Sequence, residues 1–231
     1  HIGLISSILL LVFKRLNEKV KYIVIDVILI FYGCIVLFPA SVQRCITFFV
    51  INSINKLFDL KISSLKVLLL TIFILIFSNV RIIYDFGFIY SVCTVGGILL
   101  CSKFINSKNK LFSAFKLSLI AFLFSLPVSL YNYHEINLLS IVFNMFYVPY
   151  VSIVVYPLSI ICLFFKNLIP VFDLFIKILE ISTSYFSSIK IFKIYMGFNI
   201  YECFIYYLLL FLFIKYFKKI FLLGIMSIFL F

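Results

Sequence analysis

One apolar stretch of this sequence contains an arginine and three other side chains that form hydrogen bonds. The four are Gln43, Arg44, Thr47 and Asn55. If the stretch is helical, they share about 120° of arc on one face. Such a face can line a wet path, where the cation would bind phosphate, or it can hydrogen bond to a neighbouring helix. The residues alone leave both interpretations open.

Three prolines, Pro127, Pro149 and Pro157, interrupt other apolar stretches. Proline lacks the backbone N–H and frees a carbonyl that lipid cannot satisfy, so we expect these positions inside a helix bundle or beside water. Asn144 lies shortly before Pro149. Its amide could satisfy freed backbone groups or line a path, and both roles stay open.

Carboxylates in or beside apolar stretches are further candidates for chemistry. Asp26 could serve a proton relay, or it could pair with Lys21 or a backbone group, because a basic segment precedes it. Arg81 and Asp85 are four residues apart at an external helix start, where they could simply pair with each other or serve a function, and both interpretations stay open.

The residues that commonly act in enzyme active sites form no known catalytic motif in this sequence. Its two histidines are His1 and His134, and its six cysteines have no metal-ligand spacing. The sequence therefore predicts no enzyme, no cofactor, no metal site and no disulfide framework.

The composition indicates that lipid, and not water, surrounds most of this chain. Of the 231 residues, 65% are hydrophobic and 12% are charged, whereas soluble domains have about 45–50% apolar and about 25% charged residues. So few ionisable side chains cannot cover a water-exposed surface. The sequence predicts an all-α, polytopic transmembrane helix bundle with broken helices and one amphipathic helix. We expect a single domain over residues 1–231 that is a fragment of a longer protein.

Apolar stretches bounded by charge predict the positions of the helices. They cover residues 2–13, 22–38, 42–54, 67–77, 86–104, 111–130, 138–165, 171–189, 201–214 and 220–231. Lysines and arginines cluster in alternate connections, near residues 14–21, 56–66, 103–116 and 215–219, which the positive-inside rule places in the cytoplasm. The connections at 39–41, 79–85 and 131–135 are then external. An external Asn199 requires either a break in 138–165 at a proline or a crossing by 171–189.

The stretch 171–189 has one polar stripe on an otherwise apolar helix. The stripe spans about 100° of arc and consists of Asp173, Lys177, Glu180, Ser184, Ser187 and Ser188. This pattern predicts either a helix lying in the headgroup plane or a helix facing a polar cavity.

Ordered motifs in these stretches resemble one protein family. The segment PVSLYNYHEINLLSIVFNMFYVPYVSIVVYPLSII, from Pro127 to Ile161, is similar to the pattern P-x-x-x-Y-x-F-H, N-x-x-x-x-P-x-V-S and P-L of the ComEC family of competence proteins. DFGFIYSVCTVGGI, PASVQRC and the opening HIGLI resemble three further motifs of that family. The motif positions expected to be structural are His1, Gly3, Asp85, Gly87, Ser91, Gly97, Pro127, Pro149, Ser152 and Pro157.

The resemblance implies a channel in the bacterial cytoplasmic membrane that moves single-stranded DNA inward during natural transformation. It implies single-stranded DNA, the lipid bilayer, a cytoplasmic motor and external DNA-receptor proteins as partners, and it leaves a homo-oligomer open. We expect any nuclease activity to lie outside this chain. The candidates to line the DNA path are Gln43, Arg44, Thr47, Asn55, Tyr131, His134 and Asn144.

Two other functions fit the residues. A small-solute or ion-coupled transporter would use Asp26, Asp85 or Glu202 as a relay. A membrane scaffold that transports nothing would use the polar faces only for helix contacts.

Overall fold

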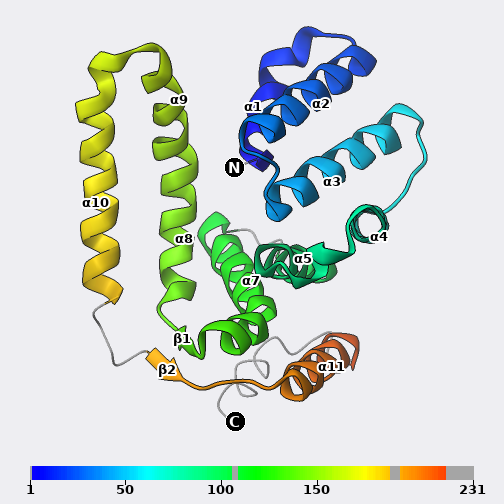
Figure 1. Cartoon of the computed structure of the whole chain (residues 1–231), viewed down its shortest axis with the longest axis vertical. Coiled ribbons are helices and arrows are strands. Elements are labelled where there is room, and N and C mark those ends of the chain that lie inside the picture. Colours follow the sequence, from blue (N-terminus) through cyan, green and yellow to red (C-terminus); the bar gives the residue numbers. More distant parts are fainter. Residues whose placement is uncertain (1, 106–108, 188–192, 217–231) are drawn as a thin grey trace.

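The computed structural model describes residues 2–105, 109–187 and 193–216. Within these ranges the chain is almost entirely helical (Figure 1), which confirms the predicted all-α class. The first half forms α1 (Ile2–Val12), α2 (Glu18–Ile35), α3 (Ala40–Leu57), α4 (Ser64–Ser78), α5 (Phe86–Leu100) and α6 (Ser102–Ile105). The second half forms α7 (Lys110–Tyr133), α8 (Ser140–Tyr150), α9 (Tyr156–Phe164), α10 (Ile169–Ser187) and α11 (Ile200–Tyr216).

The helices match the predicted apolar stretches because charged or turn-forming residues bound each one. The expected helix over 86–104 divides into α5 and α6 at Cys101. The expected helix over 220–231 lies outside the described residues. Two segments, Leu111–Tyr133 and Ser140–Cys162, are each 23 residues long and apolar enough to cross a membrane.

The helices cross one another at wide angles instead of forming a bundle of parallel rods. Figure 1 shows α4 end-on, whereas α8, α9 and α10 are seen from the side. Many large apolar side chains are exposed to the surroundings, for example Leu11, Phe77 and Tyr201, each more than 70% exposed. Such a surface is costly in water and suits lipid.

The stretch predicted over 138–165 stays one rod despite its prolines. A π-helical turn, Val151–Val155, joins α8 to α9 between Pro149 and Pro157. Pro157 falls in the first turn of α9, directly after the π-helical turn. The prolines therefore shift the hydrogen-bond register without separating the helix into two.

The helix α10 returns along this rod as its antiparallel neighbour (Figure 1). The rings of Phe143 and Phe186 are 4.1 Å apart, and the Tyr150 hydroxyl donates to the Phe175 carbonyl at 3.1 Å. Of the two alternatives left by the charge pattern, the arrangement of this hairpin corresponds to a return by α10, but α10 is not among the described helices that are apolar enough to cross a membrane.

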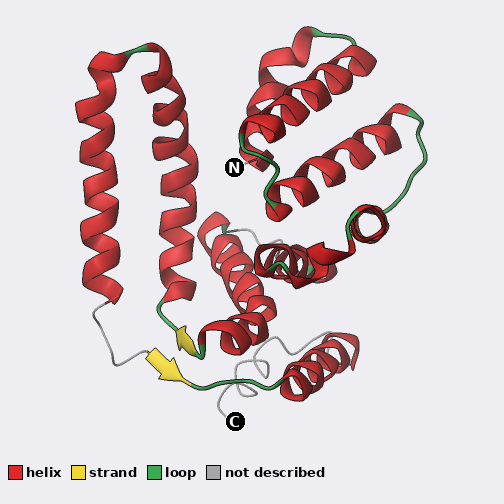
Figure 2. Cartoon of the chain, viewed as in Figure 1, coloured by secondary structure: helices red, strands yellow, loops and turns green. Residues whose placement is uncertain are grey.

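A short ribbon at the base of the hairpin holds its two ends together. Strands β1 (Glu135–Asn137) and β2 (Lys193–Tyr195) pair antiparallel, with Glu135 opposite Tyr195 (Figure 2). The chain therefore enters the hairpin directly after β1 and returns to β1 at β2, once α10 has ended.

The polar stripe of α10 points away from α8. Its described members Asp173, Lys177, Glu180 and Ser184 are exposed, and they lie on the side of the helix opposite Phe175 and Phe186. Among the described residues no ion pair joins the three charged members. The Ser187 side chain and Ser188 lie outside the described part.

Helix α11 satisfies the backbone at the proline of α7. Pro127 is fully buried inside α7, and its missing N–H leaves the Leu123 carbonyl without a helical partner. The Tyr206 hydroxyl donates to that carbonyl at 3.1 Å, and the neighbouring Tyr207 hydroxyl donates to the Phe124 carbonyl at 2.8 Å. Side chains 83 residues away in the sequence thus replace the lost backbone hydrogen bond.

We expect Tyr206→Phe to destabilise the fold by about 0.6–1.7 kcal/mol, the range for interhelical hydrogen bonds in membranes. The Leu123 carbonyl would then be buried without a donor. Reversible unfolding in mixed micelles measures the change. Tyr201→Phe is the matched control because Tyr201 is 79% exposed, and an equal loss in both variants would contradict the assignment.

Candidate functional site

The Arg44 side chain is buried between α3 and α5. It is 6% exposed, and its Nε donates to the Ser91 hydroxyl of α5 at 2.6 Å. Its Nη2 donates to the Cys45 sulfur at 2.9 Å. The fold thus joins two residues from separate sequence motifs in one contact.

No carboxylate neutralises this guanidinium within the described part of the chain. Its two hydrogen-bond acceptors, a hydroxyl and a thiol, are neutral. A buried charge without a counter-ion is costly, and in a membrane protein it marks an ion or substrate pathway by default. Arg44 carries five N–H groups, and two of them are used here. The guanidinium therefore keeps donors available for an anion.

A tight connection fixes the start of α3 and hence the position of Arg44. Leu37 and Phe38 adopt positive φ angles of 60° and 48°. The Gln43 amide donates to the Phe38 carbonyl at 2.9 Å and ties this turn to the first turn of α3. In this structure Gln43 is therefore engaged with backbone.

The start of α5 positions Ser91. The Asp85 carboxylate caps the helix by accepting from the Phe88 N–H at 2.8 Å. Asp85 does not pair with Arg81: the cap occupies its carboxylate, and Arg81 lies in a separate 3-10 turn, Val80–Tyr84, that Asn79 caps. A Cβ at Gly87 would lie 3.2 Å from the Asp85 carboxylate, so glycine leaves room for the cap.

The remaining polar residues of α3 do not join Arg44 and have separate surroundings. Asn55 forms two hydrogen bonds of 2.9 Å with the backbone of Ile62 and closes the connection to α4. Thr47 is half-buried on the same helix. Asp26 of α2 accepts from the buried Ser53 hydroxyl at 3.1 Å instead of pairing with Lys21, which lies closest to Glu18.

The candidates around residue 131 gather at the end of α7. His134 ends the helix in the left-handed conformation, and its Nδ1 lies 3.0 Å from the Leu130 carbonyl. Its own carbonyl accepts from the Met196 N–H, which ties α7 to the β2 segment. A Cβ at Gly197 would lie 2.9 Å from the His134 ring, so the close approach requires glycine. Tyr131 is exposed beside this junction.

Three other motif residues lie on the α8–α9 rod. Asn144 and Pro149 are exposed on α8, and Ser152 is half-buried in the π-helical turn. Asn144 makes no hydrogen bond with the described residues and so does not satisfy the backbone near Pro149. The carbonyl of Gly3, in α1, accepts hydrogen bonds from the Ser6 and Ser7 hydroxyls. His1 lies outside the described residues.

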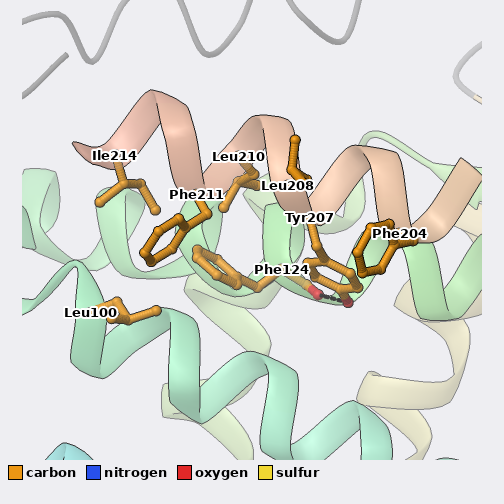
Figure 3. Close-up of a pocket in the computed structure, with 8 residues that line it drawn as sticks. All are labelled: Leu100, Phe124, Phe204, Tyr207, Leu208, Leu210, Phe211 and Ile214. Atoms are coloured by element: carbon orange, nitrogen blue, oxygen red, sulfur yellow. Dashed lines mark hydrogen bonds between the residues drawn. The ribbon is translucent and has the colours of Figure 1, made fainter. Parts of the chain in front are cut away.

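Side chains of α11, with Leu100 of α5 and Phe124 of α7, line an open apolar pocket of about 390 Å³ (Figure 3). The hydroxyl of Tyr207, one of its lining residues, is directed to the Phe124 carbonyl, so the pocket offers hydrocarbon and aromatic surface. Within the described residues, no group of three or more His, Cys, Asp and Glu side chains could hold a metal ion.

Sequence reasoning did not find Tyr206, Tyr207 and Gly197. Tyrosines are abundant in this chain, and nothing in the local sequence marks these two as partners of α7. Pro127 predicts a backbone carbonyl without a helical donor, but only the fold shows that α11 supplies the hydroxyl that donates to it.

Gly97 allows α5 and α7 to approach closely. A Cβ there would clash with the Phe124 ring, whereas at the adjacent Gly96 the nearest atom would be 3.8 Å away. We expect Gly97→Ala to cost about 1–3 kcal/mol through overpacking. Gly96→Ala should be neutral or stabilise the helix by up to about 1 kcal/mol. Unfolding in mixed micelles compares the pair, and equal stability of the two variants would contradict the close approach.

Comparison with known proteins identifies the family. The family described as competence protein matches residues 1–220. Neither the curated proteins nor the solved structures give a match. The family match includes Arg44, Ser91, Pro127 and the hairpin, and the resemblance seen in the motifs is thereby confirmed. The chain belongs to the competence protein family, as a ComEC-type transmembrane competence domain with a role in DNA uptake.

Proposed function

We propose that this chain is the channel module that moves single-stranded DNA across the bacterial cytoplasmic membrane during natural transformation. Arg44 is its phosphate-contacting residue. The buried guanidinium without a carboxylate partner is the observation that carries the proposal. Membership of a DNA-uptake family supplies the substrate class.

The physical argument rests on the charge of the substrate. A DNA strand brings one negative charge per phosphate, and cationic side chains provide most of the sequence-independent attraction to it. Ser91 holds the Arg44 Nε, so the guanidinium plane is oriented and its free N–H groups need no further ordering when a phosphate arrives. Because the Ser91 hydroxyl is uncharged, the positive charge of Arg44 stays available to a phosphate, whereas a carboxylate in the same place would neutralise it.

Asn144 belongs to the same proposal. It is an exposed amide on Ser140–Cys162, one of the two segments long enough to span the membrane. A polar side chain facing hydrocarbon is costly, so we infer that this side of α8 faces water or the transported strand. Tyr131 is an exposed aromatic ring at the end of α7, and such rings stack on bases without sequence preference.

The charge pattern supplies the orientation. With the lysine-rich connections inside, the β1–β2 ribbon and the α2–α3 turn lie outside, and the Lys166 turn between α9 and α10 lies inside. We propose that external DNA-receptor proteins deliver the strand to the ribbon side and that a cytoplasmic motor takes it up on the lysine-rich side. Homo-oligomer formation is compatible with this arrangement.

Replacing Arg44 tests the proposal in the intact protein, expressed in a naturally transformable host. We expect Arg44→Ala to lower DNA internalisation by about 100-fold or more, because the strand loses its buried phosphate contact. Arg44→Lys should retain part of the activity, since the charge remains while the Ser91-oriented fork is lost. Transformation frequency and uptake of labelled DNA are the measurements.

Arg15→Ala is the control, because Arg15 is an exposed cation in a basic connection. It should leave internalisation unchanged, and all variants should reach the membrane in equal amounts. Normal transformation in Arg44→Ala, with normal membrane insertion, would reject the assignment. Asn144→Ala is expected to lower internalisation as well.

Asp26 favours a second candidate function, an ion-coupled transporter. Its carboxylate accepts one hydroxyl hydrogen bond and pairs with no cation among the described residues. That function predicts proteoliposomes in which uptake of a small metabolite follows a pH gradient and is lost in Asp26→Asn. The same variant would then transform normally. Vesicles that pass single-stranded DNA without such coupling favour the channel.

A further inference from the structure

The 3-10 turn Val80–Tyr84 places a cation and an exposed aromatic ring on one side of the chain. Side chains three residues apart are aligned on a 3-10 helix, so Arg81 and Tyr84 lie in one row. Arg81 is exposed and forms no ion pair with the described part of the chain, and Tyr84 is 80% exposed. We call these two residues the cationic row. It presents an accessible positive charge beside an accessible ring.

The other two rows of the turn lie about 120° away on either side. Ile82 is 5% exposed and packs in one cluster with Leu75 of α4 and Phe88 of α5. Val80 and Ile83 share the third row and are 63% and 41% exposed. One row therefore faces the protein and one has side chains that suit hydrocarbon, which leaves the cationic row for the aqueous side.

The carboxylate next to this turn is held away from the cationic row. Asp85 follows Ile82 by three residues, so it continues the buried row, and its carboxylate accepts from the Phe88 N–H at 2.8 Å. At the other end of the turn, the Asn79 side chain accepts from the Arg81 N–H at 3.1 Å. The backbone is thus fixed at both ends while the guanidinium stays available.

The turn lies beside the ends of the two helices that hold Arg44. Ile82 packs with Phe88 near the start of α5, and Ala40, the first residue of α3, lies against the same cluster. Ser91 follows Phe88 by three residues, and Arg44 follows Ala40 by four. The Arg44–Ser91 contact is therefore one helical turn, about 5 Å, farther along both helices.

We propose that Arg81 and Tyr84 receive the single strand before it reaches Arg44, with a phosphate on the guanidinium and a neighbouring base stacked on the ring. The proposal rests on the channel function and on the orientation that places this turn outside. A cation beside an aromatic ring binds single strands without sequence preference. A phospholipid headgroup would use the cation but has no planar group to stack on the ring, so the pair favours a strand.

The experiment uses the full chain in phosphatidylcholine nanodiscs and a single-stranded oligonucleotide that carries 5-iodouracil. Irradiation joins this base to an aromatic ring on which it stacks, and peptide mass spectrometry locates the ring. The yield at Tyr84 across oligonucleotide concentrations measures binding at the cationic row alone. We expect crosslinks at Tyr84 and none at Phe77, which is 85% exposed but lies on the apolar helix α4.

Replacing the cation tests its part in this binding. Arg81→Gln should lower the affinity measured at Tyr84 by about fivefold at about 0.1 M salt. It should also reduce the slope of log affinity against log salt by about 0.7, the value for one phosphate contact on a single strand. Arg81→Lys should keep the slope. Lys66→Gln is the matched control, because it removes an exposed charge at the opposite end of α4, about 20 Å away, and should change neither quantity.

The outcomes separate this proposal from the channel function. Crosslinks at other rings but not at Tyr84, in a protein whose Arg44→Ala variant fails to internalise DNA, would overturn the cationic row alone. Unchanged affinity in Arg81→Gln would assign that cation to the membrane surface and overturn it as well. So would equal weakening in Arg81→Gln and Lys66→Gln. An oligonucleotide that crosslinks to no part of the chain would count against both proposals.

Discussion

Hydrocarbon offers no hydrogen bonds, so every polar group that this chain places among its helices needs a partner within the protein. The constraint explains the contacts that hold the second half together. Pro127 leaves a carbonyl free in the middle of α7, and α11 packs where Tyr206 can donate to it. The same constraint makes Arg44 the main functional candidate. A hydroxyl and a thiol accept some of its hydrogen bonds, but they do not neutralise the charge of its guanidinium.

The helices could be predicted from the sequence because charged or turn-forming residues mark their ends. The apolar stretch predicted over 171–189 appears as α10 (Ile169–Ser187), and that predicted over 201–214 appears as α11 (Ile200–Tyr216). The structure shows α10 returning along an unbroken α8–α9 rod, with β1 paired to β2 at its base, whereas the sequence left open whether 138–165 breaks at a proline. Strands of three residues give no readable pattern, because their stability comes from the segments they connect.

The candidate site was harder to predict, since a helical projection gives the direction of a side chain but not what it meets. Gln43 and Asn55 share a face with Arg44, yet each is bound to the backbone of a nearby turn. Asp85 has the spacing of an ion pair with Arg81 and acts as a helix cap. The contact between Arg44 and Ser91 spans 47 residues, and only the packing of α3 against α5 creates it.

Photo-crosslinking during DNA uptake tests most directly whether the strand passes beside Arg44. A photoreactive residue at Thr47, half-buried on α3 close to Arg44, should crosslink to labelled single-stranded DNA as it enters the cell. The same residue at Phe73, which is 68% exposed on the apolar helix α4, should crosslink to lipid alone. DNA crosslinks at Phe73 with none at Thr47, in cells that internalise DNA normally, would contradict the account.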